Sequence, residues 1–554
     1  MYIRSGFTAP FVLEADEDSL FGSPLVFNIS VNPAADSSVV ADITGLQSST
    51  VYYYRCRFSG NTDTRKGRFK TFPAPGQKTD FTLVTGSCQE TANMDVFDRI
   101  TEINPLMLLH TGDYTYPSYQ LDNSYYTSYA TMQHSWRRRY EEYKMKDMLL
   151  SVPIDYIHDD DDGFGAAKNF WITPHHTQDS SGTVYNYFDV DTLPIQGRYN
   201  HSRAYTEYFP HYPLVDTSKG LFHSYTIGNT EIFFLDTRSS AEPYHKAFIY
   251  DSASGQWAFS PDTNHTILGE TQMQWLKQGL QNSTADWKIL VCGLPFNKRL
   301  KMLIYFGIAF QASVFDIGGT QGTGLRLAAS FASYWAGHPY DQQELLDFIH
   351  INNIEDVIVV SGDTHHNVID DGLNAGLPEL NASGLSVTDL GLAYYINQYS
   401  VALGYPVLDS MWNVGGNGLG PSPNFLNAFG KIDVYKGDSL RLCIVDETGA
   451  SIACHTIVNS MLAGTGPSAP GVFASVFPNP TSGGLTIRMK ENFAYSAEDA
   501  LYIVDAQGRF VKWINRDQPF QQTMSTDLSG YPAGVYYLIF DGLKDKYSAK
   551  IILK

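Results

Sequence analysis

The segment PLMLLHTGDYTYP (residues 105–117) carries an apolar run directly into an aspartate and a tyrosine. Its first half, PLMLL, predicts a buried β-strand, because a short apolar run followed by turn-forming residues is typical of a strand inside a sheet. Asp113 and Tyr116 follow that run and lie three residues apart. The sequence therefore predicts that a buried strand presents a carboxylate and a phenol at its carboxyl end.

Further apolar runs in the middle of the chain also end in polar clusters. They are FTLVTGSCQE (81–90), VPIDYIHDDDD (152–162), EIFFLDTR (231–238), WKILVCGLPFN (287–297) and VIVVSGDTHHN (357–367). Apolar residues at helical spacing predict helices over 270–281 and 341–352. Strands that alternate with helices predict a layered α/β domain, in which the functional site lies at the carboxyl ends of the strands.

The two ends of the chain have a different pattern. Residues 1–76 contain short strand-like runs separated by polar turns, which predict a small fibronectin-like β-sandwich. Residues 473–554 follow the linker GTGPSAPG (464–471) and predict a second small β-sandwich. We therefore expect a multidomain protein in which these units flank a central α/β domain over residues 80–460.

Composition limits the partners of the chain. It has 58 acidic and 38 basic residues among 554, a net charge of −20. An acidic surface repels phosphate backbones, so we expect no general nucleic-acid-binding surface. No segment reaches the roughly 18 consecutive apolar residues of a membrane-spanning helix. The N-terminal segment lacks the apolar core of a signal peptide, so a secreted form would need a start upstream of Met1.

The chain has five cysteines, an odd number that leaves at least one unpaired. Cys443 and Cys454 lie symmetrically about ETGA (447–450), a hairpin turn that would place them opposite each other. The sequence leaves open whether they form a disulfide.

Candidate metal ligands collect at the predicted strand ends. They are Cys88, Asp113, Tyr116, Asp159, Asp160, Asp161, Asp162, Asn169, Asp236, Asp363, His365 and His366. Oxygen donors with an imidazole suit a metal site, and a thiolate with a phenolate favours iron at one position. Each motif alone is more typical of a turn, a buried thiol or a solvated acidic loop. Their coincidence at the strand ends of one α/β region favours two close cations, which can clamp a phosphoryl group.

The middle region resembles the PhoD-like alkaline phosphatases, a branch of the metallophosphoesterases. The resemblance lies in GSCQE (86–90), GDYTYP (112–117), HSRAYTEYFP (201–210), LDTRSS (235–240), ILGETQMQWLKQGL (267–280), WAGHPYDQQELLDFI (335–349) and SGDTHHN (361–367). These segments occur in the order of the family. The stretch TGLQSSTVYYYRCRF (44–58) is similar to the domain that precedes the catalytic part in this family.

The resemblance implies a mixed centre of Fe³⁺ and Ca²⁺. By motif position, the iron ligands would be Cys88, Asp113, Tyr116 and Asp363. Asp113 would also bridge to calcium, and His365 would lie on the calcium or phosphate side. Arg238 would either face the phosphate or pair with a neighbouring strand-end acid.

Two stretches depart from the family pattern. The family usually has Trp-Asp-Asp-His-Asp/Glu followed closely by Asn, whereas this chain has HDDDDGFGAAKN (158–169). Asp160 and Asn169 are therefore carried over as ligands in an ambiguous register. The family also has an acid just before its Trp-Asp-Gly-Tyr-Pro-like segment, where this chain has Ser333 and Tyr334. One calcium ligand is thus lost or is supplied from elsewhere.

The C-terminal residues resemble the sorting domain of type IX secretion cargo. The resembling segments are FPNPTSGGLTI (477–487), YIVDAQGRFVKWI (502–514), LSGYPAGVYYLI (528–539) and the final KIILK (550–554). This resemblance implies the type IX secretion machinery as a partner, export through an outer membrane, and a secreted or cell-surface location.

These inferences lead to one expected function and two alternatives. We expect a secreted hydrolase that releases inorganic phosphate from small phosphate esters by attack of a metal-bound hydroxide or oxide. The expected catalytic residues are Asp113, Asp363, His365 and Arg238. The alternatives are a phosphodiesterase or phospholipase-type hydrolase on the same metals, and a non-catalytic surface-binding protein with a degenerate site.

Overall fold

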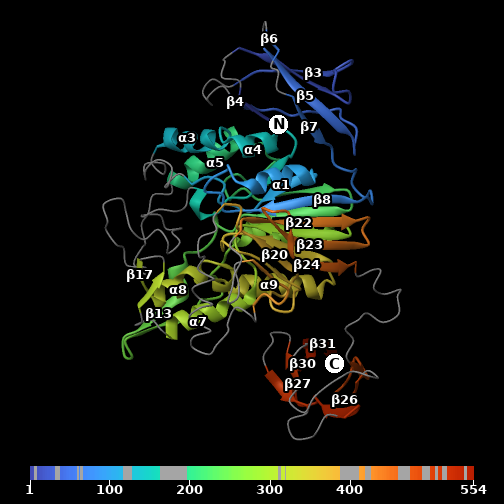
Figure 1. The fold of residues 1–554 in the computed structure, drawn as a ribbon. Helices are drawn as coiled ribbons and strands as arrows, with labels where there is room; N and C mark the ends of the chain where they lie inside the picture. The colour runs from blue at the N-terminus through green and yellow to red at the C-terminus, as the bar shows by residue number, and fades with distance from the viewer. Residues whose placement is uncertain are drawn as a thin grey trace. The chain divides into compact units, whose positions relative to one another are not determined.

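The chain divides into two units, Met1–Asn459 and Ser460–Lys554. Figure 1 shows the computed structural model, coloured along the sequence. The structure describes residues 1–4, 9–31, 38–58, 61–62, 66–116, 128–162, 196–309, 314–317, 320–386, 411–417, 426–459, 474–489, 500–505, 510–514, 521–541 and 546–554.

The first large sheet of the N-terminal unit has six strands in the order β10-β9-β8-β22-β23-β24. Their bounds are β8 (Phe81–Gly86), β9 (Met107–His110), β10 (Ile154–Tyr156), β22 (Ala428–Tyr435), β23 (Ser439–Asp446) and β24 (Ser451–Val458). Strands β8, β9 and β10 run parallel, so their carboxyl ends lie at one edge. Strand β22 pairs antiparallel with β8, although the two are far apart in the sequence.

The second large sheet has seven strands in the order β11-β12-β15-β18-β20-β19-β21. Their bounds are β11 (His223–Ile227), β12 (Thr230–Leu235), β15 (Trp287–Cys292), β18 (Val357–Ser361), β19 (Asn367–Asp370), β20 (Glu379–Ala382) and β21 (Gly415–Asn417). Strands β12, β15, β18 and β20 run parallel. The apolar run before Asp113 and the five further apolar runs of the middle region therefore form strands, as predicted. These strands are β8, β9, β10, β12, β15 and β18.

Alternation along the strands shows why both faces of the second sheet are apolar. In β12, Ile232 and Phe234 lie in a core that also contains residues of the first sheet, such as Leu108. Phe233 and Leu235 face the opposite way, into a second core. Because side chains of a strand point alternately to opposite faces, a fully apolar run marks a strand that is buried on both.

Helices contribute to both cores. Their bounds are α1 (Asp95–Ile103), α3 (Tyr129–Arg139), α4 (Tyr143–Leu149), α5 (Gln196–Tyr208), α6 (Gly269–Asn282), α7 (Lys301–Ala309), α8 (Gly324–Ala332) and α9 (Pro339–Ile351). Helices α1 and α3 to α5 add residues to the core shared by the two sheets, and α6 to α9 add residues to the second core. The helices predicted over 270–281 and 341–352 are confirmed as α6 and α9.

Short elements complete this unit. They are the hairpins β13 (Phe248–Asp251) with β14 (Gln256–Phe259) and β16 (Val314–Ile317) with β17 (Thr320–Thr323), and the 3₁₀ turns Asp160–Asp162, Tyr244–Ala247, Lys298–Leu300 and Trp335–Gly337.

The N-terminal residues form strands, as their pattern predicts. Strands β2 (Phe11–Asp16), β3 (Leu25–Ile29), β5 (Val51–Phe58), β6 (Asn61–Thr62) and β7 (Gly67–Lys70) make one sheet, and β1 (Tyr2–Arg4) pairs with β4 (Ser38–Val40). The backbone N–H of Arg68 donates to the carbonyl of Leu150 at 2.8 Å, which ties this region to the α/β part. The fibronectin-like sandwich stays a prediction.

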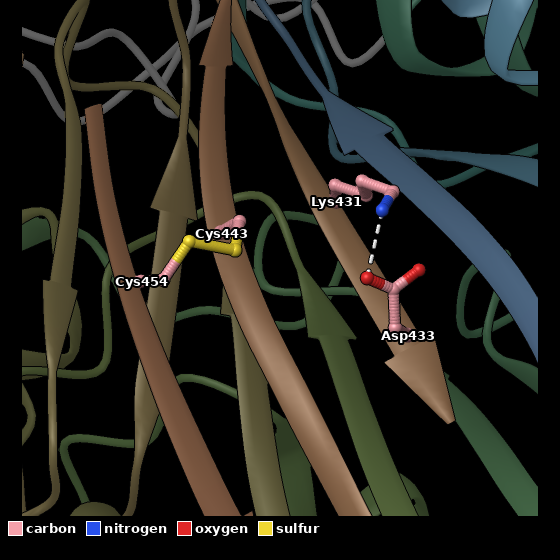
Figure 2. Close-up of a disulfide and its surroundings, with 4 residues drawn as sticks. All are labelled: Lys431, Asp433, Cys443 and Cys454. Atoms are coloured by element: carbon pink, nitrogen blue, oxygen red, sulfur yellow. Dashed lines mark hydrogen bonds and ion pairs between the residues drawn. A yellow bond between two sulfur atoms is a disulfide. The ribbon is translucent and has the colours of Figure 1, made fainter. Parts of the chain in front are cut away.

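The hairpin of β23 and β24 carries the disulfide that the sequence left open. Cys443 and Cys454 are directly opposite in the register of the two strands and are bonded (Figure 2). Cys56, Cys88 and Cys292 are not part of a disulfide.

The second unit consists of two small sheets. One contains β25 (Ala474–Phe477), β26 (Gly484–Met489) and β29 (Thr523–Asp527), and the other β27 (Ala500–Asp505), β28 (Phe510–Trp513), β30 (Gly534–Asp541) and β31 (Lys546–Leu553). Residues of both sheets, among them Ile487 and Leu538, share one core. Within the described residues of the whole chain, every helix is too short or too polar to cross a membrane.

Candidate metal centre

The carboxyl ends of parallel strands from both large sheets meet at one place. Cys88 follows β8, Asp113 follows β9, and the run Asp159–Asp162 follows β10. On the other sheet, Arg238 follows β12 and Asp363 follows β18. The loops that follow the parallel strands of both sheets therefore lie in one region, as expected for the carboxyl ends of strands in α/β sheets.

Two glycines allow these loops to approach each other. A Cβ atom on Gly112 would lie 2.4 Å from the Cβ of Asp159, and one on Gly362 would lie 2.4 Å from the hydroxyl of Ser87. A third, independent contact is the bond from the N–H of Asp363 to the Ser87 hydroxyl, at 3.4 Å. The glycine before each aspartate is thus explained by close packing between strand-end loops.

Four candidate site residues have a left-handed backbone. The φ angles are 59° at Cys88, 53° at Asp113, 72° at Asp363 and 56° at His365. This conformation is uncommon for residues other than glycine and costs on the order of 1 kcal/mol each. Such strain concentrates at functional sites, where the surrounding structure holds side chains in a required direction.

The thiol, the phenol and one carboxylate are in direct contact. The Cys88 thiol lies 3.5 Å from Oδ2 of Asp113, and the Tyr116 hydroxyl donates to the same oxygen at 3.2 Å. Ligand atoms of Cys88, Asp113 and His365 all lie within 4.8 Å of one another. The structure therefore brings together the residues that the sequence placed at three separate strand ends.

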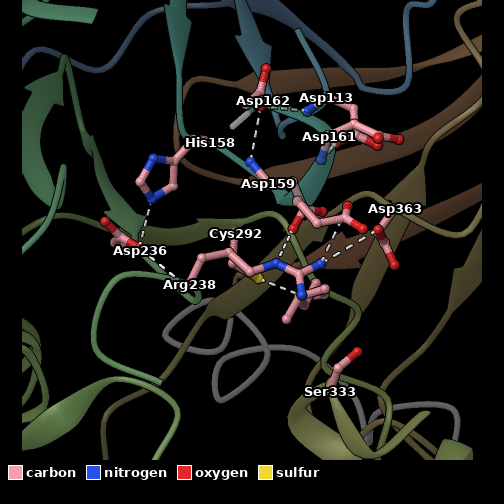
Figure 3. Close-up of polar contacts among 12 residues, drawn as sticks. Asp113, His158, Asp159, Asp161, Asp162, Asp236, Arg238, Cys292, Ser333 and Asp363 are labelled. Atoms are coloured by element: carbon pink, nitrogen blue, oxygen red, sulfur yellow. Dashed lines mark hydrogen bonds and ion pairs between the residues drawn. The ribbon is translucent and has the colours of Figure 1, made fainter. Parts of the chain in front are cut away.

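The consecutive aspartates have different surroundings (Figure 3). Asp159 forms a close ion pair with Nε of Arg238. Ligand atoms of Asp113, Asp159 and Asp160 lie within 4.8 Å of one another. The backbone N–H of Asp161 donates to Oδ1 of Asp113 at 3.1 Å.

Arg238 is the buried cation among these acids. Besides Asp159, its Nη2 lies 3.6 Å from Oδ1 of Asp160 and 3.6 Å from Oδ1 of Asp363. Burial disfavours the charged guanidinium, but the three carboxylates outweigh this effect and raise its pKa. The same Nη2 has no hydrogen-bond partner among the described residues. Arg238 thus carries a fixed charge with donor capacity left over.

The acids of the cluster outnumber its cations. Burial, followed by the charges of neighbouring acids, raises the pKa of Cys88, of Asp113 and of Tyr116. Burial and the charge of Asp160 raise the pKa of Asp363 to about 7. Buried carboxylates at this density hold protons or need cations. Thiol, phenol, imidazole and carboxylate donors fit a site with one harder and one softer metal position.

Other predicted residues lie around this cluster rather than in it. Asp236 accepts bonds from the N–H of Ser239 at 2.7 Å and of Arg238 at 3.0 Å, and pairs with Nε2 of His158 at 2.8 Å. It therefore holds the loop that carries Arg238. His366 is buried and bonds through Nδ1 to the carbonyl of Thr364 at 2.8 Å. Asn169 lies outside the described residues.

The two residues at the place of the missing acid have different roles. The Ser333 hydroxyl donates to the carbonyl of Ser330 at 2.7 Å, and Figure 3 shows Ser333 apart from the carboxylates. The Tyr334 phenol is buried, and this burial, followed by the charge of Asp363, raises the pKa of the phenol. Sequence reasoning missed the pairing of His158 with Asp236, because the two residues are far apart in the sequence and a motif does not show which distant side chain its residues contact.

The thiol, phenol, imidazole and carboxylates form a candidate metal centre in an α/β fold, and a family model identifies the family of the chain. The model described as PhoD-like phosphatase matches residues 81–385, which is more than half of the chain. The chain therefore belongs to the PhoD-like phosphatase family. Residues 475–554 match the model of the secretion system C-terminal sorting domain. The resemblances inferred from the motifs are thus confirmed.

Three individual proteins are among those to which the chain is similar. Alkaline phosphatase D of Bacillus subtilis (strain 168) is 25% identical over 360 residues, which cover 60% of this chain and 54% of the relative. The chain thus spans about half the length of this curated relative. A solved structure described as "Structure of PhoD" is 17% identical to this chain, and the match covers 82% of this chain and 84% of that structure. Its TM-score of 0.56 shows that the two folds are alike. A purple acid phosphatase from yellow lupin (Lupinus luteus) seeds is 12% identical with a TM-score of 0.46, covering 84% and 73%.

Proposed function

We propose that the chain is a metal-dependent phosphohydrolase that releases inorganic phosphate from small phosphate esters. The observation that carries this proposal is the contact of the Cys88 thiol and the Tyr116 phenol with one oxygen of Asp113, beside the guanidinium of Arg238. The name of the Bacillus relative, alkaline phosphatase D, supports the same reaction.

The resemblance to the family suggests which residues would hold metals, and the contacts of Cys88 and Tyr116 with Asp113 support this assignment. We assign one site to Cys88, Asp113, Tyr116 and Asp363, and a second to Asp113 and Asp160, with Asn169 as a further candidate ligand. His365, which has a ligand atom within 4.8 Å of those of Cys88 and Asp113, would lie on the calcium or phosphate side. By resemblance the metals are Fe³⁺ and Ca²⁺. When bound, such a pair supplies charge neutralisation at phosphorus and lowers the pKa of water.

Arg238 would bind a phosphoryl oxygen of the substrate. Its Nη2 has ion-pair contacts with Asp160 and Asp363 but no hydrogen bond among the described residues. Asp160 and Asp363 would each hold a cation, which would neutralise the carboxylate charge that faces the guanidinium. Nη2 would then donate to the phosphate, while Nε stays paired with Asp159.

The sorting domain extends the proposal to the location of the protein. A C-terminal sorting domain implies recognition by the type IX secretion machinery and export to the cell surface or the medium. A secreted phosphohydrolase would act on small phosphate esters outside the cell. We also retain the fibronectin-like sandwich as the proposed arrangement of residues 1–76.

The proposal is tested on the purified full chain with calcium present. Metal content, the visible spectrum, and hydrolysis of p-nitrophenyl phosphate against bis-p-nitrophenyl phosphate are measured. We expect bound iron, a tyrosinate-to-iron absorption band and turnover of the monoester. Tyr116→Phe removes only the phenol oxygen, so it should abolish the band and reduce turnover.

Each other result has a defined meaning. Preference for the bis-ester would replace the proposal with a phosphodiesterase. Bound metal without turnover of either ester would favour a surface-binding protein. A chain that binds no metal under these conditions would contradict the assignment of the site.

A further inference from the structure

One of the four consecutive aspartates differs from the others in its bonding. Asp162 is fully buried, and both of its oxygens accept hydrogen bonds from the protein. Oδ2 accepts from the N–H of Asp113 at 2.8 Å and from the N–H of Asp159 at 3.0 Å. Oδ1 accepts from the N–H of Thr115 at 2.7 Å and from its hydroxyl at 3.1 Å.

These bonds leave no room for a cation on Asp162. A carboxylate has about four lone-pair sites. All four are used by the N–H groups and hydroxyl just named, so binding a metal would require breaking at least one buried bond. Asp162 therefore differs from Asp160, whose carboxylate lies within 4.8 Å of the ligand atoms of Asp113.

The groups that Asp162 binds belong to the loop that carries two proposed ligands. The backbone N–H groups of Asp113 and Thr115 both donate to Asp162, and the proposed ligand Tyr116 is the residue after Thr115. This loop has the left-handed φ of 53° at Asp113 that turns the chain back on itself. Bonds on both sides of the turn fix the direction in which the Asp113 carboxylate and the Tyr116 phenol point.

We propose that Asp162 is a positioning residue of the metal centre, which holds the Asp113–Tyr116 loop in its ligand geometry by accepting its N–H groups. Through the N–H of Asp159 it also joins this loop to the one that pairs with Arg238. Partners of this kind behind metal ligands change metal affinity by about 10- to 100-fold when they are removed. This inference rests on the proposed metal centre.

The test uses Asp162→Asn in the full chain. Asparagine has the same shape but only one acceptor oxygen, so its NH₂ group faces N–H donors on one side. We expect the affinity for iron and calcium, measured by titration of the metal-free chain, to fall by about 10- to 100-fold. The tyrosinate-to-iron band should weaken or shift, because the phenol no longer meets the metal at the same angle.

Thr115→Val is the matched control. It removes the hydroxyl, which lies 3.1 Å from Oδ1 and 3.4 Å from the backbone carbonyl oxygen of Asp162, and it keeps the backbone N–H bond at 2.7 Å. We expect its metal affinity to stay within about twofold of wild type. Thermal unfolding of the metal-free variants distinguishes a role in positioning the metal ligands from a role in stability alone. Substitution of a residue that matters only for stability would lower the melting temperature without changing the metal affinity of the folded chain.

The outcomes that overturn the inference are specific. Folded Asp162→Asn with wild-type metal affinity and an unchanged band would contradict it. If that variant does not fold, Asp162→Glu keeps the charge but displaces the oxygens, and wild-type metal binding by that variant would contradict it equally. Wild-type chain that binds no metal would overturn both this inference and the proposed function. Wild-type chain with metal and turnover, beside an unaffected Asp162→Asn, would overturn this inference alone.

Discussion

At the scale of single residues, the backbone geometry explains how a buried strand presents Asp113 and Tyr116 together at its carboxyl end. The left-handed turn at Asp113 directs the chain back, so that the Tyr116 hydroxyl reaches Oδ2 of Asp113 at 3.2 Å. Sequence motifs predicted that Cys88, Asp113 and His365 come together, because each follows an apolar strand. The same reasoning could not rank four identical aspartates, since only the surrounding N–H groups distinguish Asp162 from its neighbours.

Arg238 provides a prediction about substrate binding. Arg238→Lys keeps a charge but loses the planar fork, and Arg238→Met loses the charge. Because the guanidinium is proposed to bind a phosphoryl oxygen, we expect KM for a phosphate monoester to rise by about tenfold or more in Arg238→Met and by less in Arg238→Lys. Steady-state kinetics at equal metal content measures this. Wild-type KM in the metal-loaded Arg238→Met variant would contradict the role.

Glu379 provides a prediction about pH and stability. Burial raises its pKa from 4.5 to about 8, although one oxygen accepts from the Ser361 hydroxyl at 2.6 Å and from the N–H of Phe296 at 2.7 Å. Between these two pKa values the folded chain holds a proton that the unfolded chain lacks. The free energy of unfolding should therefore fall as pH rises from about 4.5 to about 8.

Glu379→Gln tests this directly. The amide oxygen can keep both accepted bonds but does not titrate, so the variant should lose less stability than wild type over that pH range. Each unit of separation between two pKa values corresponds to about 1.4 kcal/mol. Urea unfolding at pH 5 and pH 8 measures the difference. Parallel pH profiles for the two proteins would show that Glu379 is already ionised in the folded chain.

At the scale of elements, single strands and helices could be predicted from the sequence better than the pairing of strands that are far apart in it. The strands before Cys88, Asp113 and Asp363 follow from apolar runs, and α6 and α9 from helical spacing. The pairing of β22 with β8 was not predicted, because strands distant in sequence give no local signal of their partner. The hairpin of β23 and β24 was predicted, since a turn sequence lies midway between two apolar segments.

The disulfide of that hairpin should stabilise the six-stranded sheet. Cys443 and Cys454 are separated by 11 residues, and a bridge that closes a short loop typically contributes about 2–4 kcal/mol. Replacing both cysteines by alanine should lower the free energy of unfolding by about that amount, whereas Cys56→Ala leaves the bridge intact. Urea unfolding of both variants measures the effect. Thiol titration of denatured wild type should find only Cys56, Cys88 and Cys292, and two additional thiols would contradict the bridge.

At the scale of the whole molecule, the chain consists of a unit that contains the candidate site and a unit that matches a sorting domain. The linker composition around residues 464–471 predicted a boundary there, and the two units divide at Asn459 and Ser460. The contact of Arg68 with Leu150 shows that the N-terminal strands belong to the larger unit.

Independence of the units predicts the result of truncation. A chain of residues 1–459 retains both large sheets and every described residue of the candidate centre. We expect it to fold, to bind the same metals and to turn over phosphate monoesters at a rate within about twofold of the full chain. Circular dichroism, metal analysis and kinetics compare the two. A truncated chain that is unfolded or inactive would show that the second unit supports the first.

The most direct test of the central claim is the release of inorganic phosphate from p-nitrophenyl phosphate at defined metal content. The full chain is assayed as purified, after removal of metal by chelation, and after iron and calcium are returned, with Asp113→Asn beside it. Our account predicts that turnover is lost with the metals, recovers when they return, and is absent in Asp113→Asn, because Asp113 joins both proposed metal positions. Turnover that persists without metal, or a wild-type rate in Asp113→Asn, would contradict it.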